Sequence, residues 1–241
     1  MHRVLALSNW AEIPAQLREH PADLLVFTPL CCADGAEPRI AWMLRHHPEV
    51  GLLLYTDLEG GGREAWRFGR FGVDDLVVEG VDDGRHDVRR AARRALARAL
   101  GRQVGRAVRG RIPPLLERCL VRAIDGAIRP MTAEDLAEPE GLDVGSLMHR
   151  LRSEGLPPTG RILRWGRLFR AAAALDRDEH SVEAIALALG YSTGAALSRA
   201  MRRDIGHPPS TLRERGGLQC AIEAFLNREG PAGPGPGLVL H

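Results

Sequence analysis

The clearest structural signal in this 241-residue chain is the stretch Ser181-Val182-Glu183-Ala184-Ile185-Ala186-Leu187-Ala188-Leu189-Gly190-Tyr191-Ser192. Ser181 is a helix-capping residue type, and apolar residues follow it with helical spacing at positions 182, 185, 186 and 189. Gly190 can adopt the left-handed conformation that ends a helix, and Ser192 can cap the next one. The pattern predicts a helix-turn-helix, whose second helix can lie in the major groove of DNA.

The helix predicted after this turn, from Thr193 to Asp204, has two distinct faces. Its expected core stripe consists of Ala196, Leu197, Ala200 and Met201. Its other face is polar and basic, with Thr193, Ser198, Arg199, Arg202 and Arg203 and no acid before Asp204. The segment Gly206-His207-Pro208-Pro209-Ser210-Thr211-Leu212-Arg213 then ends the helix and starts the next element.

These motifs, in this order, resemble the AraC/XylS family of bacterial transcription regulators. The resemblance rests on the S-V-x-x-I-A-x-x-x-G-Y-S pattern from Ser181, an arginine near the middle of the next helix, and the G-x-x-P-S-x-x-R pattern from Gly206. It covers about residues 112 to 216. It implies an all-α domain of two helix-turn-helix units joined by a long helix, with double-stranded DNA as the partner. One monomer could then span adjacent major grooves.

The sequence before Ser181 is similar to the first unit and joining helix of that family. The matching parts are a first helix from Met131 to Ala137 capped by Thr132, a turn and cap at Gly141-Leu142-Asp143, a recognition helix from Val144 to Glu154, its end at Gly155-Leu156-Pro157-Pro158, and a joining helix from Arg161 to Leu175. The segment Glu138-Pro139-Glu140 in the first turn departs from the family's pattern.

The resemblance also implies which residues contact DNA. Base-reading positions fall on Gly145, Ser146 and His149 in the first recognition helix and on Gly194, Ala195 and Arg199 in the second. Glycine and alanine have no hydrogen-bonding side chain, and His149 stands where arginine is common, so few bases are read directly. Phosphate contacts fall to Arg150, Arg152, Arg202 and Arg203. The alternative for all of these arginines is a solvated helix face.

The first half of the chain follows another pattern, in which short apolar runs alternate with helical stretches. The expected strands are Val4 to Leu7, Leu24 to Phe27, Leu52 to Tyr55 and Leu76 to Val78, and the expected helices are Trp10 to Glu19, Ile40 to His47 and Arg63 to Phe68. Such alternation predicts a small doubly wound α/β domain with a parallel sheet. The fold class is therefore α/β followed by all-α.

Three stretches of this half resemble a response-regulator receiver domain. They are Asp23-Leu24-Leu25-Val26-Phe27-Thr28-Pro29, His47 to Thr56, and Phe71-Gly72-Val73-Asp74-Asp75-Leu76-Val77-Val78. By this match the phosphoacceptor position is Thr28 and the usual lysine position is Glu79, while Thr56 alone fits the pattern. Thr28 lacks the carboxylate, and Glu79 would repel a phosphoryl group. We expect a degenerate receiver-like module used for dimerisation or for contact with the second domain.

Two further constellations in this half favour ordinary structure. Cys31-Cys32 together with His46-His47 could bind a metal, but we favour the interpretation that the cysteines are small loop residues and the histidines end a helix. Gly60-Gly61-Gly62 lacks the spacing of a phosphate-binding loop and is interpreted as a flexible connection. The four cysteines show no metal-like spacing, so we expect reduced thiols and no metal or cofactor.

Charge divides the chain more sharply than the net value of +2 suggests. Residues 1–84 hold 7 Arg and 14 acids, a net charge of −7, whereas residues 85–111 hold 10 Arg and one acid, a net charge of +9. Apolar residues in the basic segment follow one helical face, which predicts a long amphipathic helix. Its arginines could touch DNA phosphates, lie against the acidic domain, or be solvated.

The predicted organisation is a receiver-like domain at 1–84, a basic linker helix at 85–111, a DNA-binding domain at 112–216, and a C-terminal helix and disordered tail at 217–241. No secretory signal or membrane span is evident, so we expect a cytoplasmic protein. No catalytic set has useful spacing, which argues against an enzyme. The sequence therefore predicts a sequence-specific transcription regulator, which could form a homodimer through its first domain. The alternative is an interaction module with weak, largely non-specific DNA binding.

Overall fold

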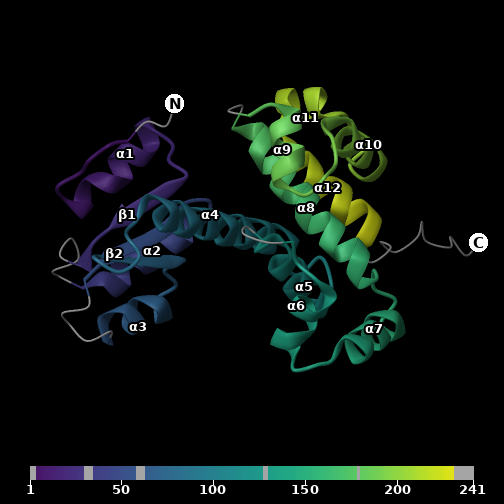
Figure 1. Cartoon of the computed structure of the whole chain (residues 1–241), viewed down its shortest axis with the longest axis horizontal. Coiled ribbons are helices and arrows are strands. Elements are labelled where there is room, and N and C mark those ends of the chain that lie inside the picture. The colour runs from purple at the N-terminus through teal and green to yellow at the C-terminus, as the bar shows by residue number, and fades with distance from the viewer. Residues whose placement is uncertain (1–3, 30–34, 58–62, 127–129, 178–179, 231–241) are drawn as a thin grey trace, which may run out of the picture. The chain divides into compact units, whose positions relative to one another are not determined.

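The computed structural model describes residues 4–29, 35–57, 63–126, 130–177 and 180–230 (Figure 1). The chain divides into two compact units at Ala99 and Leu100. Cys31-Cys32, Gly60-Gly61-Gly62 and the tail at 231–237 lie outside the described residues, so the predictions for them stay predictions. Among the helices of the described ranges, none is long and apolar enough to cross a membrane.

The N-terminal unit is built on a three-stranded parallel sheet. Its strands are β1 (Leu24–Phe27), β2 (Gly51–Thr56) and β3 (Asp75–Val78), in the order β1-β2-β3. Its helical elements are η1 (Trp10–Glu12), α1 (Ile13–Glu19), α2 (Ala36–His46) and α3 (Arg63–Arg70). Leu25 lies opposite Leu52, and Leu54 opposite Leu76. The predicted α/β class is confirmed.

The central strand β2 is buried on both faces, which explains its uninterrupted apolar sequence. Leu52 and Leu54 belong to a cluster that includes Ile40 and Met43 of α2. Leu53 lies on the other face of the strand, in a second cluster with Val77 and Ala91. Successive side chains of a strand point to opposite faces, so both faces of this short sheet need a helical cover.

The strand predicted at Val4 to Leu7 is wrong. These four residues have no regular structure, and the side chain of Val4 is 86% exposed. A strand requires a neighbour for its backbone hydrogen bonds, and within the described ranges β1 pairs with β2 alone. An apolar run without a partner strand or a covering helix does not become part of a sheet.

Helix α4 (Arg85–Val108) confirms the long helix predicted in the basic segment but corrects its single apolar face. Val88 and Ala91 pack beside the sheet, whereas Leu100, Val104 and Val108 belong to the core of the C-terminal unit. At 100° per residue these two sets lie on nearly opposite sides of the helix. The buried face changes because the helix contributes to two separate cores.

Two arginines of α4 contact the acidic N-terminal unit. Arg94 forms an ion pair with Asp75, and Arg98 donates a hydrogen bond to the backbone carbonyl of Asp74. Both acceptors belong to the acidic N-terminal unit. At these two positions the basic residues lie against the acidic unit, as one of the three alternatives proposed.

The C-terminal unit is all-helical after the end of α4. Its elements are α5 (Pro114–Ile124), α6 (Ala133–Ala137), η3 (Glu138–Glu140), α7 (Val144–Ser153), α8 (Thr159–Asp176), α9 (Val182–Ala188), α10 (Gly194–Asp204), α11 (Pro209–Arg215) and α12 (Gly217–Glu229). One core joins them, and fully buried Leu120, Phe169, Leu197 and Phe225 come from four of these helices. Helix α8 joins the pair α6–α7 to the pair α9–α10.

Candidate nucleic-acid interface

Both recognition helices begin with a side chain that caps the first turn. The Asp143 carboxylate accepts a hydrogen bond from the Ser146 amide at 2.9 Å, and the Thr193 hydroxyl accepts from the Ala196 amide at 3.1 Å. Hydrogen bonds from Ser146 hold the pKa of Asp143 below its ordinary value. The expected cap Asp143 is confirmed, but Ser192 is not the cap of the second helix. Thr193 takes that role because α10 begins one residue later than expected.

These two caps align the recognition helices residue by residue. Leu147 and Leu197 are both the fourth helical residue, and each is fully buried. His149 and Arg199 are both the sixth, and Arg152 and Arg202 both the ninth. All four of these side chains are exposed. The two helices therefore present the same positions to solvent, although they differ in sequence.

The arginines of this surface fall into two groups. Within the described residues, the guanidinium groups of Arg152, Arg199 and Arg202 form no hydrogen bond or ion pair. Arg150 is paired with Glu154 at 3.0 Å, and Arg203 with Asp204 at 2.8 Å. Three of the predicted DNA-contacting arginines are thus free to meet phosphates or bases, and two already have a carboxylate partner.

Hydroxyl groups predicted at this surface are used within their own helices. The Ser146 hydroxyl donates to the Asp143 carboxylate at 2.6 Å, and the Ser198 hydroxyl donates to the Gly194 carbonyl at 2.8 Å. The Thr193 hydroxyl is the cap acceptor described above. These three hydroxyl groups stabilise the helices that carry them. The donor function of Ser146 and Ser198 and an acceptor function of Thr193 are therefore already engaged.

Gly194 is the first residue of α10 and does not lie on the exposed surface where we expected a base-reading residue. It is buried, and its amide donates to the Glu183 carboxylate at 2.6 Å. Counted from the caps, it matches Val144 of the first unit, whereas Gly145 matches Ala195. Gly145 and Ala195 are both exposed but carry no hydrogen-bonding side chain. Gly194 thus offers a base neither a side chain nor a free amide.

The comparisons with known proteins agree with this geometry. A family described as a helix-turn-helix domain matches residues 136–215, from within α6 to the end of α11. The regulatory protein SoxS of Salmonella typhimurium is 31% identical over 97 residues, which cover 40% of this chain and 91% of SoxS. The chain belongs to the AraC family. No solved structure gives a significant match to the chain.

Membership of the AraC family confirms several predictions made from the sequence. AraC-family proteins are DNA-binding transcription regulators rather than enzymes, and their helix-turn-helix units bind double-stranded DNA. The family match leaves out the N-terminal unit and helix α12. What those two parts of this AraC-family protein do is therefore a separate question.

The unusual Glu138-Pro139-Glu140 segment of this family member is held by a residue that the sequence did not reveal. It forms the 3-10 turn η3, and Gly141 follows it in a left-handed conformation. Arg118 of α5 donates two hydrogen bonds to the Glu140 carboxylate, at 2.7 and 2.6 Å. This guanidinium lowers the pKa of Glu140. Arg118 lies 22 residues away, so no local pattern could have indicated the contact.

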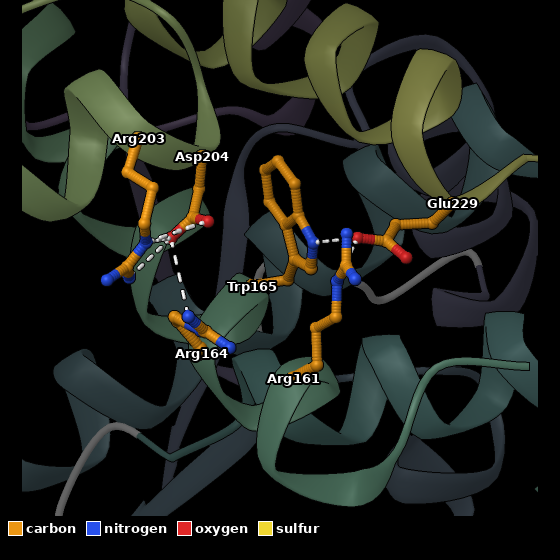
Figure 2. Close-up of polar contacts among 6 residues, drawn as sticks. All are labelled: Arg161, Arg164, Trp165, Arg203, Asp204 and Glu229. Atoms are coloured by element: carbon orange, nitrogen blue, oxygen red, sulfur yellow. Dashed lines mark hydrogen bonds and ion pairs between the residues drawn. The ribbon is translucent and has the colours of Figure 1, made fainter.

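Two further contacts missed by the sequence connect α8 to the second unit. Asp204 accepts from Arg203 and lies 3.9 Å from Arg164 of α8 (Figure 2). Arg167 of α8 lies over the ring of Tyr191 at 5.1 Å. These contacts attach both the turn, through Tyr191, and the end of α10, through Asp204, to the joining helix.

Most of the positions considered for receiver and metal chemistry lie within the described residues; Cys31 and Cys32 do not. Thr56 ends β2, and its hydroxyl donates to the Asp57 carbonyl at 3.0 Å; Thr28 and Glu79 follow β1 and β3. His46 bonds the Trp42 carbonyl and stacks on the Trp42 ring, and His47 contacts Glu49. Among the residues whose placement is described, no group of three or more His, Cys, Asp or Glu could hold a metal ion.

Proposed function

We propose that this protein is a sequence-specific transcription regulator whose two recognition helices read adjacent major grooves of one DNA site. Arg199 and His149, at the same place in the two helices, would contact base edges. Arg152 and Arg202, also at one shared place, would contact phosphates and fix the protein on the duplex. Arg150 and Arg203 would add weaker phosphate contacts, since each must first leave a carboxylate.

The observation that carries this proposal is the shared pattern of the two helices. Two unrelated surface helices would have no reason to place exposed basic or imidazole side chains six and nine residues after their caps. Two helices that dock in the same way on successive grooves would need such side chains at equivalent positions. The other members of the predicted surface, Gly145 and Ala195, leave room for the helix backbone to approach the bases.

For the N-terminal unit, we infer a receiver-like module that does not accept a phosphoryl group and that pairs two copies of the chain. Thr28 stands at the end of β1, where the match requires an aspartate, and the acid Glu79 follows β3. Val26 of the edge strand β1 is 53% exposed, an apolar side chain that a second copy would cover. A regulator of this kind would work in the cytoplasm, together with its DNA.

The direct test is selection from randomised DNA with the full chain, followed by sequencing of the bound fraction. A recurrent motif is the expected result. For that motif, Arg199→Ala should lower affinity about 10-fold or more while affinity for random DNA changes little, because a base contact contributes about 1–3 kcal/mol to discrimination. Arg228→Ala, an exposed arginine of α12, serves as the control.

Two other results would overturn parts of the proposal. Equal losses on the motif and on random DNA would remove the base-reading role of Arg199. Salt-dependent binding without any recurrent motif would instead favour an interaction module that binds DNA non-specifically. For the N-terminal unit, sedimentation that shows a monomer at micromolar concentration would contradict pairing, and stable phosphoryl incorporation from a small phosphodonor would contradict its lack of phosphorylation.

A further inference from the structure

Helix α12 begins on a carboxylate of the joining helix. Asp176, the last residue of α8, accepts hydrogen bonds from the amides of Gly217 and Leu218 at 2.5 and 3.0 Å. A side chain at Gly217 would come within 3.0 Å of the Ala172 carbonyl, so this end of α12 lies directly against α8. The first amides of a helix lack partners within the helix, and Asp176 supplies one from another element.

The other end of α12 is attached to the opposite end of α8. Glu229, the last residue of α12, accepts from the indole N–H of Trp165 at 2.8 Å and from the Arg161 guanidinium at 2.6 Å (Figure 2). The Glu229 side chain is only 4% exposed. Both partners lie in the first half of α8, so α12 runs antiparallel to α8 and is fixed at both ends.

Between these two attachments the helices share an apolar contact. Phe225 is fully buried, and its ring lies 5.2 Å from that of Trp165 and 5.7 Å from that of Phe169. Ala221 and Ile222, one turn earlier, are also buried. These positions form the apolar stripe of an amphipathic helix, and their burial holds α12 against α8 between the two polar attachments.

The stretch of α8 that α12 covers contains a weak point. Gly166 lies in the interior of α8, where glycine stabilises a helix less than alanine does and favours a bend. The glycine is required there, because an added Cβ would lie 2.5 Å from the Ala123 carbonyl of α5. Arg161 and Trp165 precede Gly166 and Asp176 follows it, so the attachments of α12 stand on both sides of the glycine.

We propose that α12 is a brace that keeps α8 straight across Gly166 and thereby fixes the distance and angle between the two recognition helices. Asp176 and Glu229 are then positioning residues for DNA recognition, which act through α8 and touch no base. They set which spacing between the two half-sites the protein accepts. This inference rests on the proposed function, because it assumes that both units bind one DNA site.

The test compares two duplexes: the motif obtained by selection, and the same motif with one base pair inserted between its half-sites. Wild type should bind the second duplex at least about 10-fold more weakly, since one base pair both lengthens and rotates the site. In Asp176→Ala and Glu229→Ala the ratio of the two affinities should fall at least about threefold, because a bendable α8 lets the units adjust. Trp165→Phe, which removes the indole N–H donor and keeps an aromatic ring, should lower the ratio less.

The affinity ratio separates positioning from a loss of folded protein. A smaller active fraction changes the apparent affinity for both duplexes by one factor, and that factor cancels in the ratio. Glu223→Ala is the matched control, because Glu223 is an exposed acid of α12 that pairs with Gln219 of the same helix at 2.8 Å.

Three results are informative. Unchanged ratios in Asp176→Ala, Glu229→Ala and Trp165→Phe would overturn the brace. A ratio that falls equally in Glu223→Ala would also overturn it, because Glu223 makes no contact with α8 in the hydrogen bonds and ion pairs of the described residues. A wild-type protein without any selected motif would instead overturn the proposed function, a distinct outcome.

Discussion

In the first helix-turn-helix unit the turn is held by charge, and in the second it is held by a backbone contact. Arg118 reaches from α5 to Glu140 in the first turn, with its own side chain 53% exposed. In the second unit the Glu183 carboxylate binds the amide of Gly194, which is buried at the start of α10. The recognition helices that follow nevertheless expose the same positions. Different local contacts hold two helices that expose equivalent positions, so the units should respond differently to substitution.

The largest expected difference concerns a glycine in the first turn of each recognition helix. Gly194→Ala should lower the free energy of unfolding by about 1–2 kcal/mol, because its Cβ would lie 2.7 Å from a Glu183 carboxylate oxygen and 3.2 Å from the Glu183 amide nitrogen. Gly145→Ala should cost clearly less, because its Cβ would meet only a side-chain oxygen of Asp143 at 3.1 Å, while this exposed helical position gains up to about 1 kcal/mol of helix propensity. Urea denaturation followed by circular dichroism measures both. Equal effects of the two substitutions would show that the starts of α7 and α10 are packed in the same way.

The second prediction sharpens what the two helices share. Arg152→Ala and Arg202→Ala should each weaken binding to all DNA sequences by about 3- to 10-fold and should each reduce the slope of log affinity against log salt by about 1. Arg203→Ala should have a smaller effect, because Asp204 already neutralises this guanidinium. Titrations at several salt concentrations provide the measurement. A loss confined to the selected motif at either arginine would contradict a phosphate role.

A third and smaller effect tests whether the two caps are equivalent. Asp143→Ala and Thr193→Ala should each lower stability by about 1 kcal/mol, since each removes an acceptor for a first-turn amide. Ser192→Ala should be neutral within error, because Thr193 caps α10. Thermal unfolding of the three variants checks this. A cost at Ser192 equal to that at Thr193 would return the cap to the position the sequence suggested.

The smallest expected effect is a pH dependence of folding stability that arises in the turn of the first unit. The pKa of Glu140 is lowered in the folded protein, so its contribution is present above the unfolded-state pKa and is lost as pH falls through the folded-state pKa. Glu140→Gln should therefore remove part of the stability loss between neutral pH and about pH 3, by less than about 1 kcal/mol for this surface pair. Denaturation midpoints at several pH values measure it. A pH profile of Glu140→Gln identical to that of the wild type would contradict this contribution of the Arg118–Glu140 pair.

The sequence predicted best those features that local patterns encode. The caps Thr132, Asp143 and Ser181 and the left-handed Gly141 and Gly190 stand where predicted, because a helix end needs a side-chain acceptor or a residue that tolerates positive φ. The β2 and β3 strands were found from short apolar runs. The same pattern wrongly predicted a strand at Val4 to Leu7, since a run of this length becomes a strand only beside another strand.

The contacts between distant segments could not be predicted from this sequence. Arg118 with Glu140, Asp204 with Arg164 and Glu229 with Trp165 join residues 22, 40 and 64 positions apart, and no local spacing connects the two members of any pair. Their meaning depends on which helix faces which. The role of Gly194 was missed for the same reason, because its glycine is explained by Glu183 in the neighbouring helix and not by its place in the motif.

Helix α4 has a consequence for how such a chain can be rearranged by recombination. Its first turns cover the sheet with Val88 and Ala91, and its last turns complete the helical core with Leu100, Val104 and Val108. A crossover at either end of α4 that brought in a foreign partner domain would separate part of one core from the rest of it. A functional chimera would have to inherit the second half of this helix and replace the first. A breakpoint tolerated by both cores therefore lies inside the helix, between Ala91 and Leu100, and not in a loop.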